Sequence, residues 1–536
     1  MSLFSIIKEC GGIHNIARIL SPDSALIVEV IDTNLLSDAA MQHDYNAPLK
    51  QVVYDQDAIA KVDKFAQELL EVGKLIADQQ QIALAPYIEQ LECEYRPSWH
   101  ISPPQGLLND PNGFIYHQGK YHLFYQWYPF SCEHKDKYWA HLTSKDLLSW
   151  QWQPVALTPS DWFDSHGVFS GHALSQGDEL MLFYTGNVRI GENRERHTMQ
   201  CLATSSDGIH FTKQGPVVPE LPPNVTPHCR DPKVIRHNDK WLMLLGAQRE
   251  DETGRLAIYQ SEDLKNWVFL SLCGDELGDF GYMWECPDFF TLGAQDFIVI
   301  GPQGINSPSE HHTVAHHNGI VKASMDNSGH VELSGFEHLD HGFDFYAPQS
   351  LQTPDGRRVM TAWMGLPDEV NHPSVDNGWV HQLTTFRELS LLNGKLIQQP
   401  IKELQSLRKE VINISGDKSC YDLKSKVFEL NIEMQWGSSI RLHQSELGYC
   451  EIRLDKKSKT LFLDRTNTLI REGDSIRELV LLEAESVQLQ IFSDNSSIEI
   501  FVNHGQAVMT ARIFTPKEAT TFSHQGAVSI VNCWLY

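Results

Sequence analysis

The sequence contains no long hydrophobic run, few basic residues for its length and no closely spaced cysteine pair. A membrane-spanning helix needs about 18 or more consecutive apolar residues, and no such run occurs. Lys and Arg number 43 against 69 Asp and Glu, and the net charge of −26 argues against nucleic acid or an anionic membrane as a partner. The ten Cys never occur as Cys-x-x-Cys, so we expect free thiols rather than a disulfide framework or a zinc site.

What the sequence does contain is typical of a soluble protein with more than one domain. It has 536 residues, 41% of them hydrophobic, and a mean hydropathy of −0.31. A chain of this length exceeds what one hydrophobic core supports, so we expect about two or three domains. Residues 1–10 carry charges where a signal peptide needs an apolar core, and we therefore expect a cytoplasmic protein.

Residues 1–94 differ from the rest and predict a partly helical N-terminal extension. Apolar side chains recur at helical spacing over residues 55–91. They are Ile59, Val62, Phe65, Leu69, Val72 and Ile76. Residues 11–16 faintly resemble the start of a sugar phosphotransferase IIB domain, but residues 17–23 lack the phosphorylated Cys of such a domain. We therefore expect a packing appendage or an oligomer contact, and the oligomeric state stays open.

From Arg96 onward short strands dominate, and they repeat at intervals near 60 residues. Five apolar strands each follow a polar or Gly-containing turn, at residues 121–125, 180–184, 241–245, 297–300 and 359–363. Their first residues are 59, 61, 56 and 62 positions apart. A period of this length with several strands in it is typical of β-propeller blades. The sequence thus predicts an all-β protein with a five-bladed β-propeller over residues 95–395.

A side chain able to bind or react precedes each of these strands by ten to thirteen residues. The five residues are Asp110, Ser170, Asp231, Glu285 and Tyr346. Equivalent positions in successive blades surround the same end of the central axis, so we expect one shared pocket. Pro follows Asp110 and Asp231 directly and Glu285 two positions later, which restricts the backbone beside each acid.

Such a pocket suits a neutral polyol and the cleavage of a glycosidic bond. Carboxylates accept hydrogen bonds from hydroxyl groups, and aromatic faces pack on sugar rings. Glycosidic cleavage needs one ionised carboxylate and one protonated acid, and crowding of carboxylates raises the pKa of at least one of them. Spacing alone does not decide which acid has which role.

The ordered motifs resemble the signature of glycoside hydrolase family 32, which includes invertases, sucrose-6-phosphate hydrolases, inulinases and levanases. The motifs are Trp99-His100, Leu108-Asn109-Asp110-Pro111-Asn112-Gly113, Phe169-Ser170-Gly171, Arg230-Asp231-Pro232, Glu285-Cys286-Pro287 and Asp344-Phe345-Tyr346-Ala347-Pro348-Gln349. The resemblance covers residues 95–536. It implies a retaining mechanism on β-fructofuranosides and no metal or other cofactor.

By this resemblance, Asp110 is the nucleophile and Glu285 is the acid/base. Asp231 is expected to hold fructose hydroxyl groups and to stabilise the transition state. The expected substrate-binding positions are Leu107, Leu108, Asn109, Gln126, Trp139, Phe169, Ser170, Arg230, Tyr346 and Trp363. The family commonly has Trp-Met where this chain has Leu107-Leu108, Gly where it has Ala140, and often Ser where it has His172. None of these departures removes a catalytic carboxylate.

Strand alternation continues beyond a connector at residues 396–410 and predicts a β-sandwich over residues 411–536. Apolar side chains alternate with polar ones, as in a half-buried strand. They are Phe428, Leu430, Ile432 and Met434, followed later by Ile498, Ile500 and Val502. We expect the sandwich to pack on the propeller and to contribute mainly stability.

The predicted activity is hydrolysis of sucrose 6-phosphate or sucrose by a cytoplasmic enzyme. A fructan hydrolase, either a levanase or an inulinase, is one alternative. A catalytically silent fructan-binding protein is another, but it would be expected to have lost Asp110 or Glu285, and both are present. His311, His312, His316 and His317 have the spacing of metal ligands, but they lie in a polar segment with no Cys or carboxylate at ligand spacing, so we predict no metal site.

Overall fold

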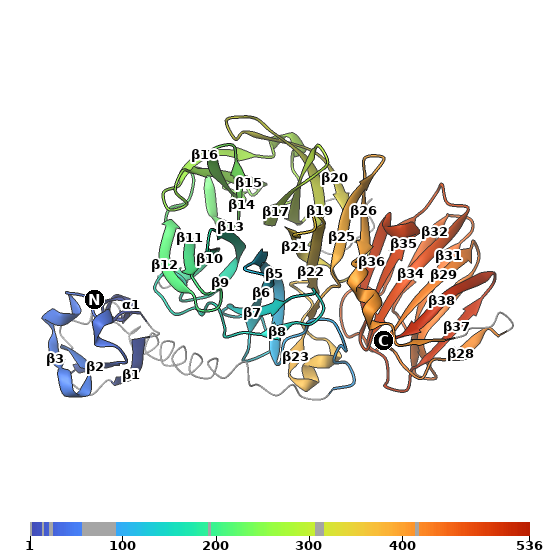
Figure 1. The fold of residues 1–536 in the computed structure, drawn as a ribbon, viewed down its shortest axis with the longest axis horizontal. Coiled ribbons are helices and arrows are strands. Elements are labelled where there is room, and N and C mark those ends of the chain that lie inside the picture. Colours follow the sequence, from blue (N-terminus) through green and yellow to red (C-terminus); the bar gives the residue numbers. More distant parts are fainter. Residues whose placement is uncertain are drawn as a thin grey trace.

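The computed structural model describes residues 3–12, 15–20, 25–55, 93–190, 194–305, 316–412 and 418–536, and strands dominate it. Figure 1 shows a small N-terminal sheet, a ring of sheets in the middle of the chain and two stacked sheets at the C-terminal end. Among the described residues the one α-helix is α1, Leu3–Glu9. Short 3-10 helices are η2 Thr33–Leu35, η3 Ala40–Gln42, η4 Ala47–Leu49, η7 Asp275–Leu277, η8 Pro373–Asn377, η9 Lys402–Leu407 and η10 Asn503–Gly505. In these ranges no helix combines the length and apolar character that a bilayer crossing requires.

The N-terminal residues form a small sheet that the sequence analysis did not predict. Its strands lie in the order β1-β2-β4-β3, with bounds β1 Ile16–Leu20, β2 Ala25–Val30, β3 Asp44–Asn46 and β4 Gln51–Asp55. Leu26 and Val28 on β2 pack with Ile6 of α1 and Tyr54 of β4. These strands are short, so their alternation is too brief to stand out in the sequence. The helix predicted over residues 55–91 falls on residues 56–92, outside the described ranges.

Five sheets, almost wholly antiparallel, follow one another along the middle of the chain. The first contains β5 Gly106–His117, β6 Lys120–Tyr128, β7 Tyr138–Ser144 and β8 Gln151–Trp152, and the second β9 Val168–Gln176, β10 Glu179–Ile190, β11 Glu195–Ser205 and β12 Thr212–Val218. The third contains β13 Val225–His237, β14 Lys240–Arg249, β15 Gly254–Ser261 and β16 Val268–Cys273. The fourth contains β17 Met283–Leu292, β18 Gln295–Gln303, β19 Gly319–Met325 and β20 Val331–His338. The fifth contains β21 Tyr346–Gln352, β22 Arg358–Met364, β25 Arg387–Leu392 and β26 Lys395–Pro400, with β24 Gln382–Leu383 beside β22.

The apolar strands predicted from the sequence all occupy the same place in these sheets. Each lies in the second strand of its sheet, on β6, β10, β14, β18 and β22. The late segment β23, Trp379–Val380, pairs in parallel with the start of β5. A hydrogen-bonded ladder thus joins the end of the run of sheets to its beginning.

A break in strand pairing recurs beside each residue predicted for the pocket. The register shifts between Leu108 and Pro111 on β5, Arg230 and Lys233 on β13, Glu285 and Asp288 on β17, Tyr346 and Gln349 on β21, and opposite Ser170 between Tyr184 and Gly186 on β10. Such bulges release a residue from the ladder and redirect its side chain. The backbone enters the left-handed region at three of these breaks, at Asp231 with φ 68°, at Cys286 with φ 47° and at Ala347 with φ 49°.

The C-terminal residues form two six-stranded sheets with a shared apolar core. One has the order β27-β38-β29-β34-β35-β36, with bounds β27 Glu410–Val411, β38 Val528–Leu535, β29 Phe428–Gln435, β34 Ser486–Asp494, β35 Ser497–Val502 and β36 Ala507–Arg512. The other has the order β28-β37-β30-β31-β32-β33, with bounds β28 Cys420–Asp422, β37 Thr521–Gln525, β30 Ser439–Ser445, β31 Gly448–Asp455, β32 Thr460–Asp464 and β33 Ile476–Val480. Strand β35 is buried on both faces, because Ile500 packs inside the sandwich while Phe501 packs against the β5 and β21 region.

All ten cysteines are free thiols, as predicted. They are distributed over every part of the fold, and seven of them are buried. Burial raises the pKa of several of these thiols, for example that of Cys229 to about 12. Most of the buried cysteines therefore act as small apolar core residues.

Candidate active site

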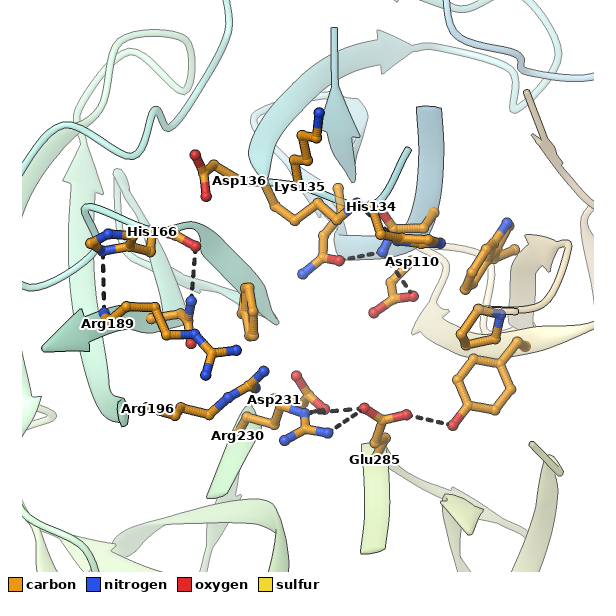
Figure 2. A pocket seen from close by; sticks show the side chains of 18 of the residues that line it. Asp110, His134, Lys135, Asp136, His166, Arg189, Arg196, Arg230, Asp231 and Glu285 are labelled. Atoms are coloured by element: carbon orange, nitrogen blue, oxygen red, sulfur yellow. Dashed lines mark hydrogen bonds and ion pairs between the residues drawn. The ribbon is translucent and has the colours of Figure 1, made fainter. Parts of the chain in front are cut away.

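The first strands of the sheets bring the predicted acids together in one cavity of about 370 Å³. Figure 2 shows Asp110, Asp231 and Glu285 pointing into this space from three different strands. The cavity is lined by Asn109, Asp110, Gln126, His134, Lys135, Asp136, Lys137, His166, Phe169, Asn187, Arg189, Arg194, Arg196, Arg230, Asp231, Glu285, Tyr346, Trp363 and Pro367. Nine of the predicted site residues are in this set, so residues separated by more than 200 positions share one pocket, as expected from the spacing.

Four predicted site residues do not line the cavity. Ser170 lies just behind it, and its hydroxyl group donates a hydrogen bond to Asp110 Oδ2. Trp139 is fully buried, and its indole Nε1 donates to the Phe169 carbonyl oxygen at 3.1 Å. Leu107 and Leu108 belong to hydrophobic clusters on either side of β5, because they precede the bulge that turns Asp110 into the cavity. These two leucines are therefore fully buried and do not line the cavity, and their contact with the substrate stays a prediction.

Asp110 lies at the bulge of β5 and accepts hydrogen bonds from three side chains. Besides Ser170, Asn109 Nδ2 donates to Oδ1 at 3.3 Å, and the Cys286 thiol donates to Oδ2 at 3.5 Å. Burial raises the pKa of Asp110, the hydrogen bond from Ser170 opposes that rise, and the nearby charge of Glu285 adds to it. These donors hold the carboxylate in one orientation at the cavity wall.

Glu285, on β17, is the most strongly bound of the three acids. Its Oε1 accepts from Arg230 Nε at 3.1 Å and Nη2 at 2.6 Å. Its Oε2 accepts from the Tyr346 hydroxyl at 2.6 Å and from Gln303 Nε2. Burial by itself would raise the pKa of Glu285, but the Arg230 charge and the Tyr346 hydrogen bond outweigh it and lower the pKa to about 2.

Asp231, on β13, is held through its backbone as much as through its side chain. Its amide N–H donates to Thr185 Oγ1 at 2.9 Å, and its Oδ2 accepts from the Cys286 amide at 3.0 Å. Burial raises the pKa of Asp231 to about 7; the Arg230 charge opposes this, and the charges of Glu285 and Asp110 add to it. The crowding predicted from the sequence thus does raise carboxyl pKa values. In the free protein it does so at Asp110 and Asp231, whereas Glu285 is held ionised by Arg230.

The sequence analysis missed a group of basic residues on one side of the cavity. We call Arg189, Arg194 and Arg196 the arginine wall; they lie around the turn between β10 and β11 and line the cavity. Figure 2 shows Arg189 and Arg196 on the same side as Arg230 and across the space from Asp110. Three Arg within eight residues, directly after an apolar strand, were the available signal. They come after the apolar strand at residues 180–184, whereas the prediction of the pocket used only positions ten to thirteen residues before each such strand.

Among the described residues, the histidines with metal-ligand spacing do not form a metal site. His311 and His312 lie outside the described residues, and His316 Nδ1 lies 3.4 Å from Asp368 Oδ2. In the described part of the chain, one group with metal-ligand geometry occurs elsewhere, formed by the buried side chains of Asp344, Glu369 and His372, whose ligand atoms lie within 4.8 Å of one another. Arg465 Nη1 already lies 2.8 Å from Asp344, so a guanidinium supplies the cation there.

Comparison with known proteins agrees with the motifs throughout the chain beyond its N-terminal extension. The model of the glycosyl hydrolases family 32 N-terminal domain matches residues 100–400, and that of the family 32 C-terminal domain matches residues 396–535. A Psychromonas ingrahamii protein described as a probable sucrose-6-phosphate hydrolase is 72% identical over 535 residues, which cover 100% of this chain and 98% of that protein.

Two further relatives extend this comparison. The sucrose-6-phosphate hydrolase of Bacillus subtilis is 40% identical over 435 residues, covering 78% of this chain and 89% of that protein. The solved structure of sucrose-6-phosphate hydrolase from Lactobacillus gasseri superposes with a TM-score of 0.77 at 29% identity, covering 86% of this chain and 96% of that one. With matching models over most of its length and relatives well above 30% identity, the chain belongs to glycoside hydrolase family 32 and is a glycoside hydrolase.

Proposed function

We propose that this protein is a retaining β-fructofuranosidase that hydrolyses sucrose 6-phosphate, and more slowly sucrose, to fructose and the glucose moiety. The proposal is supported by three acids in one cavity and by relatives that are named for sucrose-6-phosphate hydrolysis. We also propose that residues 95–395 act as a five-bladed β-propeller and residues 411–536 as a β-sandwich packed on it, joined by a connector at residues 396–410. Residues 1–94 are a separate extension in this proposal.

In the first chemical step Asp110 is the nucleophile. Its carboxylate attacks the anomeric carbon of the fructosyl group, and the bond from that carbon to the glycosidic oxygen breaks. Glu285 gives its proton to the departing oxygen, and a covalent fructosyl ester on Asp110 results. In the second step Glu285 takes a proton from water, the water oxygen attacks the anomeric carbon, and the Asp110 carboxylate is released.

The hydrogen bonds of the free protein suit Asp110 to its proposed role, whereas Glu285 must first change its partner. Ser170 and Asn109 orient Asp110, and a fixed carboxylate near the reacting carbon lowers the entropic barrier to attack. Glu285 must gain a proton to act as an acid, and its ion pair with Arg230 opposes this. We therefore propose that substrate binding separates Arg230 from Glu285, and that the proton comes from Asp231, whose pKa of about 7 makes it a proton store at neutral pH.

Asp231 completes the proposed site as a transition-state stabiliser. Its Oδ2 accepts a hydrogen bond from the Cys286 amide at 3.0 Å, which holds the carboxylate rigidly. A rigid acceptor for fructose hydroxyl groups binds more strongly as positive charge develops on the sugar ring. A phosphorylated sugar does not leave a cell unaided, so the proposal also places the enzyme in the cytoplasm.

One experiment tests both the substrate and the stereochemistry. The purified chain is incubated with sucrose 6-phosphate, sucrose, inulin and levan in buffer containing methanol, and the products are followed by NMR. We expect the highest kcat/KM for sucrose 6-phosphate and, because configuration is retained, methyl β-fructofuranoside as the transfer product. Formation of only the α-anomer would exclude a retaining mechanism. Faster release of fructose from inulin or levan than from either disaccharide would instead support a fructan hydrolase.

A further inference from the structure

The arginine wall contains two like charges that face each other across a strand pair. Arg189 on β10 and Arg196 on β11 are direct cross-strand partners. Like charges directly opposite each other destabilise a sheet, so this arrangement costs stability in the free protein. A third basic residue, Arg194, lies in the turn between them and also lines the cavity.

The surroundings of these two arginines do not neutralise them. Among the described residues neither Arg189 nor Arg196 forms an ion pair with a carboxylate; Arg189 Nη1 instead donates to the Arg194 carbonyl oxygen at 3.4 Å. The Arg196 guanidinium lies 5.5 Å from the centre of the Phe169 ring. Burial lowers the pKa of Arg196 to about 10; repulsion from Arg230 and Arg189 adds to this decrease, and the smaller attraction from Glu285 and Asp231 opposes it. The wall therefore stores unfavourable charge repulsion that an anion would relieve.

The position of the arginine wall relative to the three acids indicates which part of the substrate it would contact. Figure 2 shows Arg196 next to Arg230, which binds Glu285, whereas Asp110 lies on the opposite side of the cavity. In the proposed mechanism Asp110 contacts the fructosyl carbon and Glu285 protonates the leaving oxygen. The arginine wall is thus on the leaving-group side, where the glucose moiety lies. The other charged groups that line the cavity near its opening are Lys135, which pairs with Glu133 at 2.7 Å, Asp136 and Lys137.

A neutral glucose hydroxyl group does not require such a concentration of positive charge. Each guanidinium offers five N–H donors in a planar fork, and two forks on neighbouring strands match the three terminal oxygens of a phosphate monoester. We propose that Arg189 and Arg196, with Arg194 beside them, form the subsite that binds the 6-phosphate group of the glucose moiety and so determine the preference for sucrose 6-phosphate over sucrose. This inference rests on the proposed function and assigns its substrate specificity to particular residues.

The test separates recognition of the phosphate from the chemical step. Steady-state kinetics with sucrose 6-phosphate and with sucrose are measured for the wild type, Arg189→Met, Arg196→Met and the double variant. Arg236→Met is the matched control, because Arg236 is an exposed arginine stacked on Trp241 at the far end of β13. We expect each single variant to lower the ratio of the two kcat/KM values at least tenfold, mainly through KM for sucrose 6-phosphate. The double variant should lower it about a hundredfold, and the control should leave it unchanged.

Inhibition by products and by free anion identifies the ligand chemistry. With sucrose as substrate, glucose 6-phosphate should inhibit the wild type more strongly than glucose, and this difference should disappear in the double variant. Inorganic phosphate should inhibit much less than glucose 6-phosphate; equal inhibition would assign the wall to free anions and overturn the proposal.

Arg196→Lys serves as a second variant, since it keeps the charge without the fork, and it should lose part of the preference. Circular dichroism checks that the variants are folded. A ratio within twofold of the wild type in the double variant, with both substrates still hydrolysed, would refute the subsite. A wild-type protein that hydrolyses neither disaccharide would instead refute the proposed function.

Discussion

The acids of the cavity are slightly exposed and the acids between the ring of sheets and the sandwich are fully buried, and the two groups differ in how their charge is balanced. We call His100, Arg387, Asp494 and Glu499 the interface cluster. His100 Nδ1 lies 2.8 Å from Asp494 Oδ2, and His100 Nε2 lies 3.1 Å from Glu499 Oε1. Arg387 Nη2 lies 2.9 Å from Glu499 Oε2. In the cavity, by contrast, Arg230 is shared between Glu285 and Asp231.

The pKa values of Asp494 and Glu499 in the interface cluster are lowered, whereas those of Asp110 and Asp231 in the cavity are raised. Burial would raise the pKa of Asp494 and of Glu499, but hydrogen bonds from His100 and the nearby positive charges lower both. Burial raises the pKa of Asp110 and Asp231, and the hydrogen bonds in the cavity do not fully oppose this. The interface cluster is therefore fixed in one charge state, whereas the cavity is able to exchange a proton near neutral pH. The same residue types are expected to contribute stability in one place and, in the proposed mechanism, reactivity in the other.

The largest expected effect is that of Asp110→Ala on turnover. Removing the proposed nucleophile should lower kcat by roughly 10⁴-fold or more, because covalent attack has no substitute in the cavity. Stability should stay the same or rise, since a buried carboxylate with a raised pKa is removed. Kinetics and thermal unfolding are measured together, with Asp146→Ala as a control. Asp146 caps a turn of the same sheet, and its loss should leave kcat unaffected. Near-native turnover of Asp110→Ala would remove Asp110 from its assigned role.

Arg387→Met should reverse this result, with a large loss of stability and a small change in turnover per folded molecule. It leaves Glu499 and Asp340 buried without their shared cation, which costs about 3 to 5 kcal/mol in other proteins. Chemical denaturation of the variant and of wild type gives the free energy of unfolding. If the variant were as stable as wild type, the interface cluster would not hold the two parts of the fold together.

Asp231→Asn sharpens the comparison inside the cavity. The amide keeps the shape of the carboxylate but loses its charge and its proton exchange, so kcat should fall by roughly 10² to 10³-fold with a moderate change in KM. The pH profile of kcat/KM should also lose an inflection near pH 7, since the pKa of Asp231 is about 7. An unchanged kcat would exclude Asp231 from the catalytic group.

The smallest expected effect is the pH dependence of His100→Gln. Burial would lower the pKa of His100, but hydrogen bonds to Asp494 and Glu499 raise it above its ordinary value near 6.5. The stabilisation is therefore fully present below about pH 6.5 and is lost as pH rises through the raised folded-state pKa. That of Asp494 and Glu499 is present above about pH 4 and is lost as pH falls through their lowered values.

The variant should thus be less stable than wild type by about 1.5 to 3 kcal/mol between about pH 4.5 and 6.5. The difference should shrink at high pH. Denaturation curves at several pH values test this expectation, and a difference independent of pH would show that His100 is neutral in the folded protein.

Many residues of the cavity could be predicted from their spacing in the sequence, and the arrangement of strands in the sheets explains why. The second strand of each sheet is buried on both sides and is therefore a continuous apolar run that the sequence displays clearly. A tight turn joins the first strand of each sheet to the second, so the number of residues between the bulge residue and the apolar run is almost constant. Asp110, Asp231 and Glu285 could be aligned in this way without knowledge of the fold.

Other features could not be predicted in this manner. Glu499 alternates with apolar residues and looks like a solvent-facing position, but the ring of sheets covers that face of β35 and buries it completely. Leu107 and Leu108 adjoin the site in sequence, yet the bulge directs them into the core. Arg189 and Arg196 become neighbours only through pairing of β10 with β11 and reach the acids only through the ring of sheets.

By itself the sequence determined the succession of strands and the positions of the three acids, because hydrophobic period and turn chemistry are local properties. The glycosidase family was indicated separately, by the resemblance of the ordered motifs to a known signature. Only the tertiary structure decided which acids have raised pKa values, which acids pair with arginine and which basic residues line the cavity opposite Asp110. Those outcomes depend on burial and on charges from distant segments, and electrostatic interactions in a poorly solvated interior act between groups that the sequence separates.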